Sequence, residues 1–142
     1  MTIIDFLRLP QKLDLQIRNK LIERQQYQDI ALGITASMEG GRVSASGSKS
    51  KMADAVDRLV DIEAEVDALV DRLIDTKKEV ITAIEQVDNP IWYNMLHMRY
   101  IQYKSLQEIA DHYRKDYDWA KANMRKARDV VQQIREKEEG EH

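Results

Sequence analysis

The stretch that decides the fold is residues 105–134, SLQEIADHYRKDYDWAKANMRKARDVVQQI. Ser105 is followed three residues later by Glu108, which is the pattern of a capping box, and a helix is predicted from about 106 to 113. Asp116 can cap the next helix, which is predicted over 116–134. A short helix, a tight turn and a longer helix are typical of a helix-turn-helix.

The second predicted helix has one apolar side and one polar side. Apolar residues recur at spacings of 4, 3, 4 and 3, which places on one buried stripe Ala120, Met124, Ala127, Val131 and Ile134. The opposite side carries Asp118, Lys121, Ala122, Arg125 and Arg128. A helix of this kind can enter the major groove of DNA, but two amphipathic helices joined by a turn also occur as a plain hairpin.

Charge is distributed unevenly along the chain. The formal net charge is −3, which argues against indiscriminate binding to nucleic acid. Between Arg114 and Arg128, however, six basic residues stand against two acidic ones. A local basic patch fits phosphate contacts at a defined site, and an ordinary solvated helix face is the alternative.

If the motif binds DNA, its residues divide into two groups. The side chains opposite the buried stripe are predicted to contact bases: Tyr117, Lys121, Ala122 and Arg125. The flanking cations are predicted to contact phosphates: Arg114, Lys115, Lys126 and Arg128.

Long helices are predicted before the motif. Residues 11–34 have helical periodicity, and Pro10 marks either a helix start or a kink. Residues 52–87 carry apolar side chains at alternating spacings of 4 and 3 over five heptads, which indicates coiled-coil packing. Between them, glycine and serine are concentrated over about 35–50, which predicts a flexible loop.

The predicted architecture is all-α. Residues 1–87 are expected to form an N-terminal helical hairpin with a long coiled-coil arm. Asp88, Asn89 and Pro90 end the arm and start the next helix. Residues 88–142, which contain seven of the nine aromatic residues, are expected to form a compact three-helix domain that includes the helix-turn-helix.

Little in the sequence favours catalysis, a cofactor or a metal. The chain has no cysteine, and its three histidines fall on separate elements without the spacing of metal ligands. We find no Gly-rich phosphate loop and no nucleophile with a base beside it, so we expect neither an enzyme nor a metal or cofactor site. No apolar stretch approaches about 20 residues, so no membrane span is expected. The lack of cysteine fits a reducing cytoplasm.

Residues 98–128 resemble the C-terminal helix-turn-helix of sigma-factor region 4. The matching positions are Met98-Arg99-Tyr100, Ser105-Leu106-Gln107-Glu108-Ile109-Ala110 and Lys126-Ala127-Arg128. The front of the chain, with Leu13-Asp14, Asn19-Lys20-Leu21 and Val60-Asp61-Ile62-Glu63, resembles small phage and prophage proteins of Gram-positive bacteria related to the ArpU and RinA late-transcription regulators. This chain departs from the family pattern at Asp116, where a serine is usual, and at Arg128, where a core leucine is usual.

The resemblance implies a phage- or prophage-type transcriptional regulator that binds double-stranded DNA in the cytoplasm of a bacterial host. The coiled coil would serve homo-oligomerisation or contact with the host RNA polymerase. Two alternatives stay open. One is a DNA-packaging protein like the small terminase subunits, which also join a helix-turn-helix to a coiled coil. The other is a protein-binding adaptor that no longer binds DNA, as the acids at Asp111, Asp116 and Asp118 would suggest.

Overall fold

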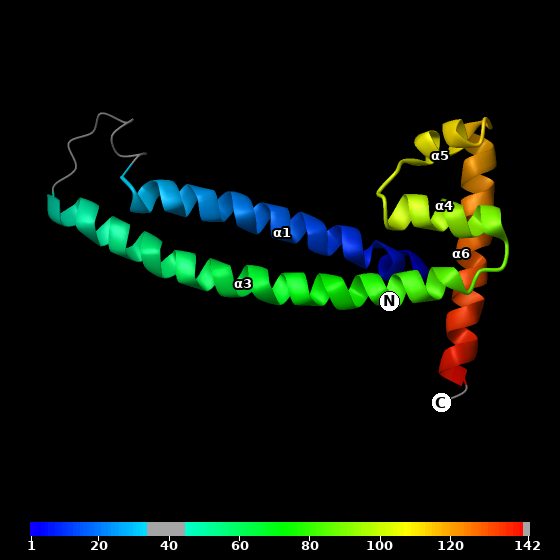
Figure 1. Ribbon diagram of the computed structural model, residues 1–142, viewed down its shortest axis with the longest axis horizontal. Helices are drawn as coiled ribbons and strands as arrows, with labels where there is room; N and C mark the ends of the chain where they lie inside the picture. Colours follow the sequence, from blue (N-terminus) through cyan, green and yellow to red (C-terminus); the bar gives the residue numbers. More distant parts are fainter. Residues whose placement is uncertain (34–44, 141–142) are drawn as a thin grey trace. The chain divides into compact units, whose positions relative to one another are not determined.

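The computed structural model describes residues 1–33 and 45–140 and is all-α over these ranges, as predicted (Figure 1). Its helices are α1 (Ile3–Ala31), α3 (Ala45–Glu85), α4 (Pro90–Tyr100), α5 (Leu106–His112) and α6 (Tyr117–Gly140). The chain packs as two compact units. Unit 1 comprises Met1–Lys12 and Leu73–His142, and unit 2 comprises Leu13–Arg72.

Helix α1 begins earlier than the sequence analysis predicts. Thr2 and Asp5 form a capping box, in which the Thr2 N–H donates to the Asp5 carboxylate and the Asp5 N–H donates to the Thr2 hydroxyl, both at 3.1 Å. The helix therefore starts at Ile3 and passes through Pro10, which neither starts nor ends it. The ring of Pro10 is fully buried, and this burial offsets the backbone hydrogen bond that a proline cannot donate.

Helix α3 also begins earlier than predicted, at Ala45 instead of residue 52. Residues 45–50 are thus helical and do not belong to the predicted 35–50 loop. The remainder of that loop and Ile34 lie outside the described residues. Helix α3 ends at Glu85, close to the predicted end at residue 87. Asn89 then caps α4 by accepting from the backbone N–H groups of Ile91 and Trp92.

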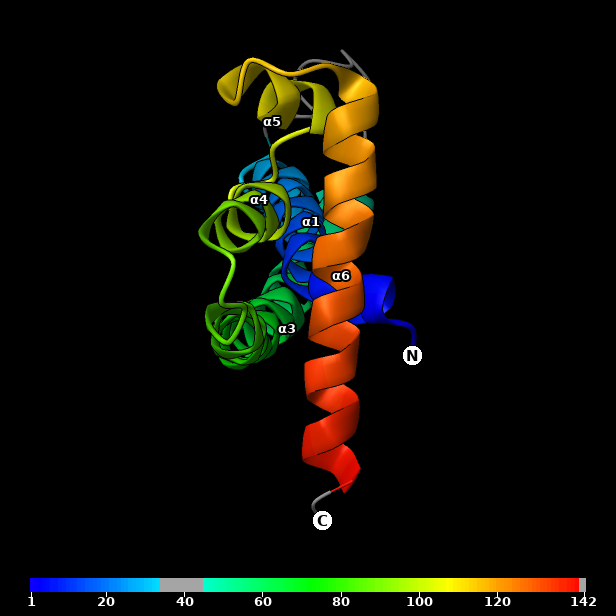
Figure 2. The same ribbon diagram turned by 90° about the vertical axis from the view of Figure 1, so that its right-hand side faces the viewer.

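Unit 1 encloses one apolar core to which each of its helical segments contributes. Its fully buried side chains include Leu7 of α1, Ile84 of α3, Leu96 of α4, Ile109 of α5 and Met124 of α6. Helices α4 and α5 pack against α6 and against each other (Figure 2). The boundary that the sequence predicts at residue 87 passes through this core, because Val80, Ala83, Ile84 and Val87 belong to it. The division of the chain into two domains at residue 87 stays a prediction.

Unit 2 is a pair of antiparallel helical segments, one from α1 and one from α3. Lys20 lies 3.1 Å from Glu65, and Arg24, one turn later on α1, lies 3.3 Å from Glu63, which comes earlier on α3. The two segments therefore run in opposite directions.

The buried line of α3 in unit 2 differs from the predicted heptad core. Ala55 and Ile62 are buried, whereas Val56 and Val70, which belong to the alternating 4 and 3 pattern predicted as the heptad core, are 50% and 36% exposed. Ala55 and Ile62 are seven residues apart and share one side of the helix, and α1 packs against that side. One partner helix can cover only one side, so the adjacent apolar line remains open.

Candidate nucleic-acid interface

Local hydrogen bonds fix the start of both helices in the 105–134 stretch. The Glu108 N–H donates to the Ser105 hydroxyl at 3.1 Å, and the Ser105 N–H donates to the Glu108 carboxylate at 3.2 Å. The Trp119 N–H donates to the Asp116 carboxylate at 2.8 Å. All three predicted caps, Ser105, Glu108 and Asp116, are thus present, since side chains satisfy N–H groups that have no partner inside a helix.

The turn between α5 and α6 is closed by a Schellman motif. The Lys115 N–H donates to the Ala110 carbonyl at 2.9 Å, and the Arg114 N–H donates to the Asp111 carbonyl at 3.1 Å. Arg114 has a φ of 55°, a left-handed conformation that glycine usually occupies in this motif. For a residue with a side chain, this conformation costs about 1–2 kcal/mol. The turn is therefore tight and its central residue is strained.

Helix α6 turns the predicted apolar stripe into the core. Ala120, Met124, Ala127 and Val131 are fully buried, and Ile134 packs against the same core. Two side-chain hydrogen bonds add to this packing. The Trp92 indole N–H donates to the Asn123 side chain at 3.1 Å, and the Asn94 amide donates to the Tyr113 hydroxyl at 2.7 Å. Neither bond was predicted from the sequence, although an asparagine inside a predicted helix can indicate a side-chain hydrogen bond.

The four predicted base-contact residues are all exposed on α6. Ala122 and Arg125 lie opposite the buried stripe. Lys121 lies at the edge of that outward side, and Tyr117, one turn before it, is 44% exposed. A planar guanidinium, an ammonium and a phenol are therefore presented along one helix, with a small side chain between them that lets a second surface approach closely.

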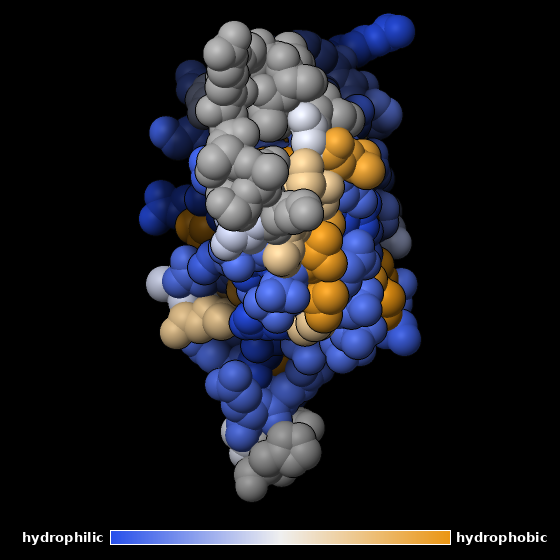
Figure 3. All heavy atoms as spheres, turned by 90° about the vertical axis from the view of Figure 1, so that its left-hand side faces the viewer, coloured by the Kyte–Doolittle hydropathy of each residue, from blue (hydrophilic) through white to orange (hydrophobic). Residues whose placement is uncertain are grey.

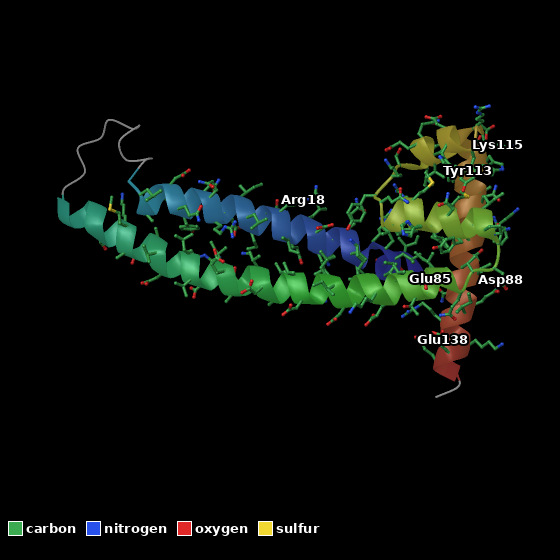
Figure 4. The ribbon with its side chains drawn as sticks, viewed as in Figure 1. Arg18, Glu85, Asp88, Tyr113, Lys115 and Glu138 are labelled. Atoms are coloured by element: carbon green, nitrogen blue, oxygen red, sulfur yellow. The ribbon has the colours of Figure 1, made fainter. Side chains whose placement is uncertain are left out.

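Three of the four predicted phosphate contacts are exposed as well. Arg114 and Lys115 lie in the α5–α6 turn, where Figure 4 labels Lys115, and Lys126 lies on α6. Arg128 differs, because it is half-buried and its guanidinium donates to the Tyr100 hydroxyl at 3.4 Å. The arginine therefore lies at the border of the core. The phosphate contact of Arg128 stays a prediction, for a side chain that is less exposed than the other three.

The outward side of α6 is more acidic than the sequence analysis assumed. Asp118 and Asp129, seven residues before and four residues after Arg125, are exposed on the same side. Asp129 lies one residue beyond the range over which the basic excess was counted. Helical spacing alone would have placed it on this side. Within the described residues, no carboxylate forms an ion pair with Lys121, Arg125 or Lys126, so the three cations remain available to an anion.

Charge also changes along the length of α6. Its first half carries Lys121, Arg125 and Lys126, whereas its last turns carry Glu136, Glu138 and Glu139. Figure 4 shows Tyr113 and Lys115 beside one end of α6 and Glu138 at the other. A polyanion would therefore be attracted to the end of α6 that joins the α5–α6 turn.

The described residues contain no group of three or more histidine, cysteine or acidic side chains that could hold a metal ion. Over the same residues, no helix has the length and apolarity needed to cross a membrane. No protein-family model matches this chain, and no curated protein or solved structure is significantly similar to it.

Proposed function

We propose that this chain is a phage- or prophage-type transcriptional regulator that binds double-stranded DNA through α5, the α5–α6 turn and α6. The observation that carries the proposal is the outward side of α6, where Lys121 and Arg125 are exposed and unpaired within the described residues. Behind them, α4 and α5 hold the helix by its buried stripe. A short capped helix, a tight turn and a longer helix with cations on its outward side are the parts of a DNA-reading helix-turn-helix.

In this proposal, α6 enters the major groove with its first half. Arg125 would donate two hydrogen bonds to one guanine, a contact worth about 1–3 kcal/mol of discrimination between bases. Lys121 and Tyr117 would contact neighbouring base edges, and Ala122 would let the helix approach a thymine methyl group. Arg114, Lys115 and Lys126 would hold phosphates and fix the orientation of the helix. The hairpin of unit 2 would supply oligomerisation or contact with RNA polymerase.

A protein-binding adaptor is the second candidate, and one observation favours it. Asp118 and Asp129 are exposed on the same side as Arg125, and Asp111 is exposed on α5. Carboxylates repel phosphates, so they would weaken binding to any DNA that approached this side. A basic peptide or protein surface would instead be attracted to these carboxylates.

Binding to duplex DNA at two salt concentrations separates the two candidates. Fragments from the DNA flanking the chain's own gene would be compared with random duplex at about 50 and 200 mM salt, because each released counterion lowers affinity as salt rises. The variant is Lys121→Ala/Arg125→Ala. The matched control is Arg18→Ala/Lys78→Ala, which removes one exposed arginine from α1 and one exposed lysine from α3.

The regulator predicts that the wild type prefers certain fragments, that this binding weakens with salt, and that the Lys121/Arg125 variant loses the preference while the control keeps it. No binding at either salt would overturn the proposal and favour the adaptor. Equal losses in the variant and the control would show that charge alone, and not the α6 surface, is responsible.

A further inference from the structure

Unit 2 leaves a row of apolar side chains uncovered on one side of the hairpin, which we name the valine face. Its members are exposed by between 36% and 73% and are Leu21, Leu32, Val56, Val60 and Val70. Only four apolar side chains of unit 2 are buried among its described residues: Leu13, Ile17, Ala55 and Ile62. Figure 3 views the molecule from its left-hand side in Figure 1, and apolar side chains gather there in a column.

An ion pair shows that the two helices contribute to the same face. Arg24 of α1 lies 3.3 Å from Glu63 of α3. On α1, Leu21 precedes Arg24 by three residues and so lies on the same side of the helix, and Leu32 follows in the turn directly after α1. On α3, Val56 and Val70 lie seven residues before and after Glu63, again on one side. The valine face therefore runs along both helices and is crossed by one ion pair.

The other face of the hairpin is occupied by charge. Glu65 lies 3.1 Å from both Lys20 and Arg58. Hydrogen bonds from Lys20 and then from Arg58 lower the pKa of the Glu65 carboxyl. The charges of this face form ion pairs within the chain, so the valine face is the side of unit 2 that would gain from a partner.

We propose that the valine face binds the valine face of a second copy of this chain, with the two α3 helices antiparallel about a two-fold axis at Glu63. The pattern on α3 is symmetric about that residue: the exposed Val56 and Val70 lie seven residues to either side, and the exposed Val60 and the half-buried Val66, at the border of the valine face, lie three residues to either side. An antiparallel pairing centred there sets Val56 against Val70 of the second copy, and Val60 against Val66. A two-fold interface requires such self-complementarity.

The charges on the valine face fit the same arrangement. Two Glu63 carboxylates would approach each other at the axis, and each already has Arg24 beside it at 3.3 Å. The two guanidinium groups then flank the two carboxylates, so each arginine can bond to the glutamate of either chain. A polar group at a coiled-coil core position commonly fixes register in this way.

The size of the face suits a reversible dimer. The α1 segment over residues 13–31 is about 30 Å long, and two helices side by side are about 20 Å wide, which gives roughly 600 Å² of flat area. A stable interface buries about 800 Å² on each partner, so we expect association at micromolar concentrations. This inference does not depend on DNA binding.

The proposed dimer is tested by measuring the mass of the full chain in solution. Sedimentation velocity from about 1 to 100 µM is expected to show a shift from the 16.6 kDa of one chain toward twice that mass. Val60→Glu/Val70→Glu should abolish the shift. The matched control, Leu15→Glu/Ile22→Glu, adds the same charges in place of exposed apolar residues on the outer side of α1 and should leave it unchanged. A monomer at every concentration, or equal effects of the two variants, would overturn the proposal.

The alignment of the two α3 helices is tested with single cysteine substitutions, which leave the rest of the valine face intact. The sequence has no cysteine, so single cysteines can be introduced cleanly. A mixture of Val56→Cys and Val70→Cys chains is expected to form a cross-linked heterodimer on mild oxidation, because a disulfide requires Cα atoms within about 7 Å. Each variant alone should cross-link far less. Equal cross-linking of each variant with itself would indicate parallel helices and contradict the two-fold arrangement, whatever the outcome of the DNA experiments.

Discussion

The indole N–H of Trp92 donates to the side-chain oxygen of Asn123 at 3.1 Å, and this bond joins α4 to the second turn of α6. The amide of Asn123 donates in turn to the Trp119 carbonyl at 2.9 Å. Asn123 is half-buried, between Ala122 on the outward side and Met124 in the core. One side chain thus ties the proposed recognition helix to the scaffold behind it.

Replacing Asn123 with alanine should lower the free energy of unfolding by about 1–3 kcal/mol, because the Trp92 N–H is left without its partner. Urea denaturation followed by far-ultraviolet circular dichroism measures the change. Gln133→Ala, at an exposed position on the same helix, is the control and should stay within about 0.5 kcal/mol. A loss for Asn123→Ala no larger than that of the control would contradict the structural role of this bond.

Arg114→Gly should stabilise the protein by about 1 kcal/mol, because glycine adopts a φ of 55° without steric cost. Lys115→Gly removes the same charge at a neighbouring exposed residue whose φ is not positive, and it should not stabilise. If the cations of the turn bind phosphates, both variants should weaken DNA binding and reduce its salt dependence by similar amounts. Thermal unfolding of the two variants measures the effect of the backbone strain, and DNA titrations measure the effect of the lost charge.

Phe6→Ala should cost about 3–5 kcal/mol, since the ring is only 3% exposed and belongs to the core of unit 1. The Arg135 guanidinium carbon lies 3.5 Å from the centre of that ring, a cation–π contact between α1 and α6. Arg135→Gln should therefore cost only about 0.5–1 kcal/mol. Similar losses for the two variants would mean that the cation, and not apolar burial, holds the start of α1 in this core.

Acid should weaken the hairpin through Glu65. Hydrogen bonds from Lys20 and Arg58 hold the pKa of its carboxyl below the ordinary 4.5, so as pH falls the unfolded chain binds this proton before the folded chain does. The stabilisation is present above pH 4.5 and is lost as pH falls through the folded pKa. Glu65→Gln should reduce the fall in unfolding free energy between pH 6 and 3. The exposed Glu79→Gln is the control, and an equal reduction there would contradict this assignment.

Local interactions account for what could be predicted from the sequence. The Ser105–Glu108 capping box, the Asp116 cap and the stripe from Ala120 to Val131 depend on residues three or four positions apart. The early start of α1 depends on the same kind of local signal, the Thr2–Asp5 capping box, which was not part of the prediction.

Features that depend on which surfaces meet could not be predicted in this way. Periodicity showed that α3 has apolar sides, but only the position of α1 decides that Ala55 and Ile62 are buried and Val56 is not. The half-burial of Arg128 against Tyr100 is likewise a tertiary contact between residues 28 positions apart. The base-contact assignments stay predictions, because exposure shows that Lys121 and Arg125 are accessible and not what they bind.

The placement of the two tryptophans has a spectroscopic consequence. Trp92 and Trp119 are the only tryptophans of the chain, and both pack against the core of unit 1. Their fluorescence therefore reports on that unit alone, whereas the helical ellipticity reports on both. Unfolding curves recorded with the two signals on one unlabelled sample would reveal whether the hairpin melts separately from the helices that carry the proposed DNA surface.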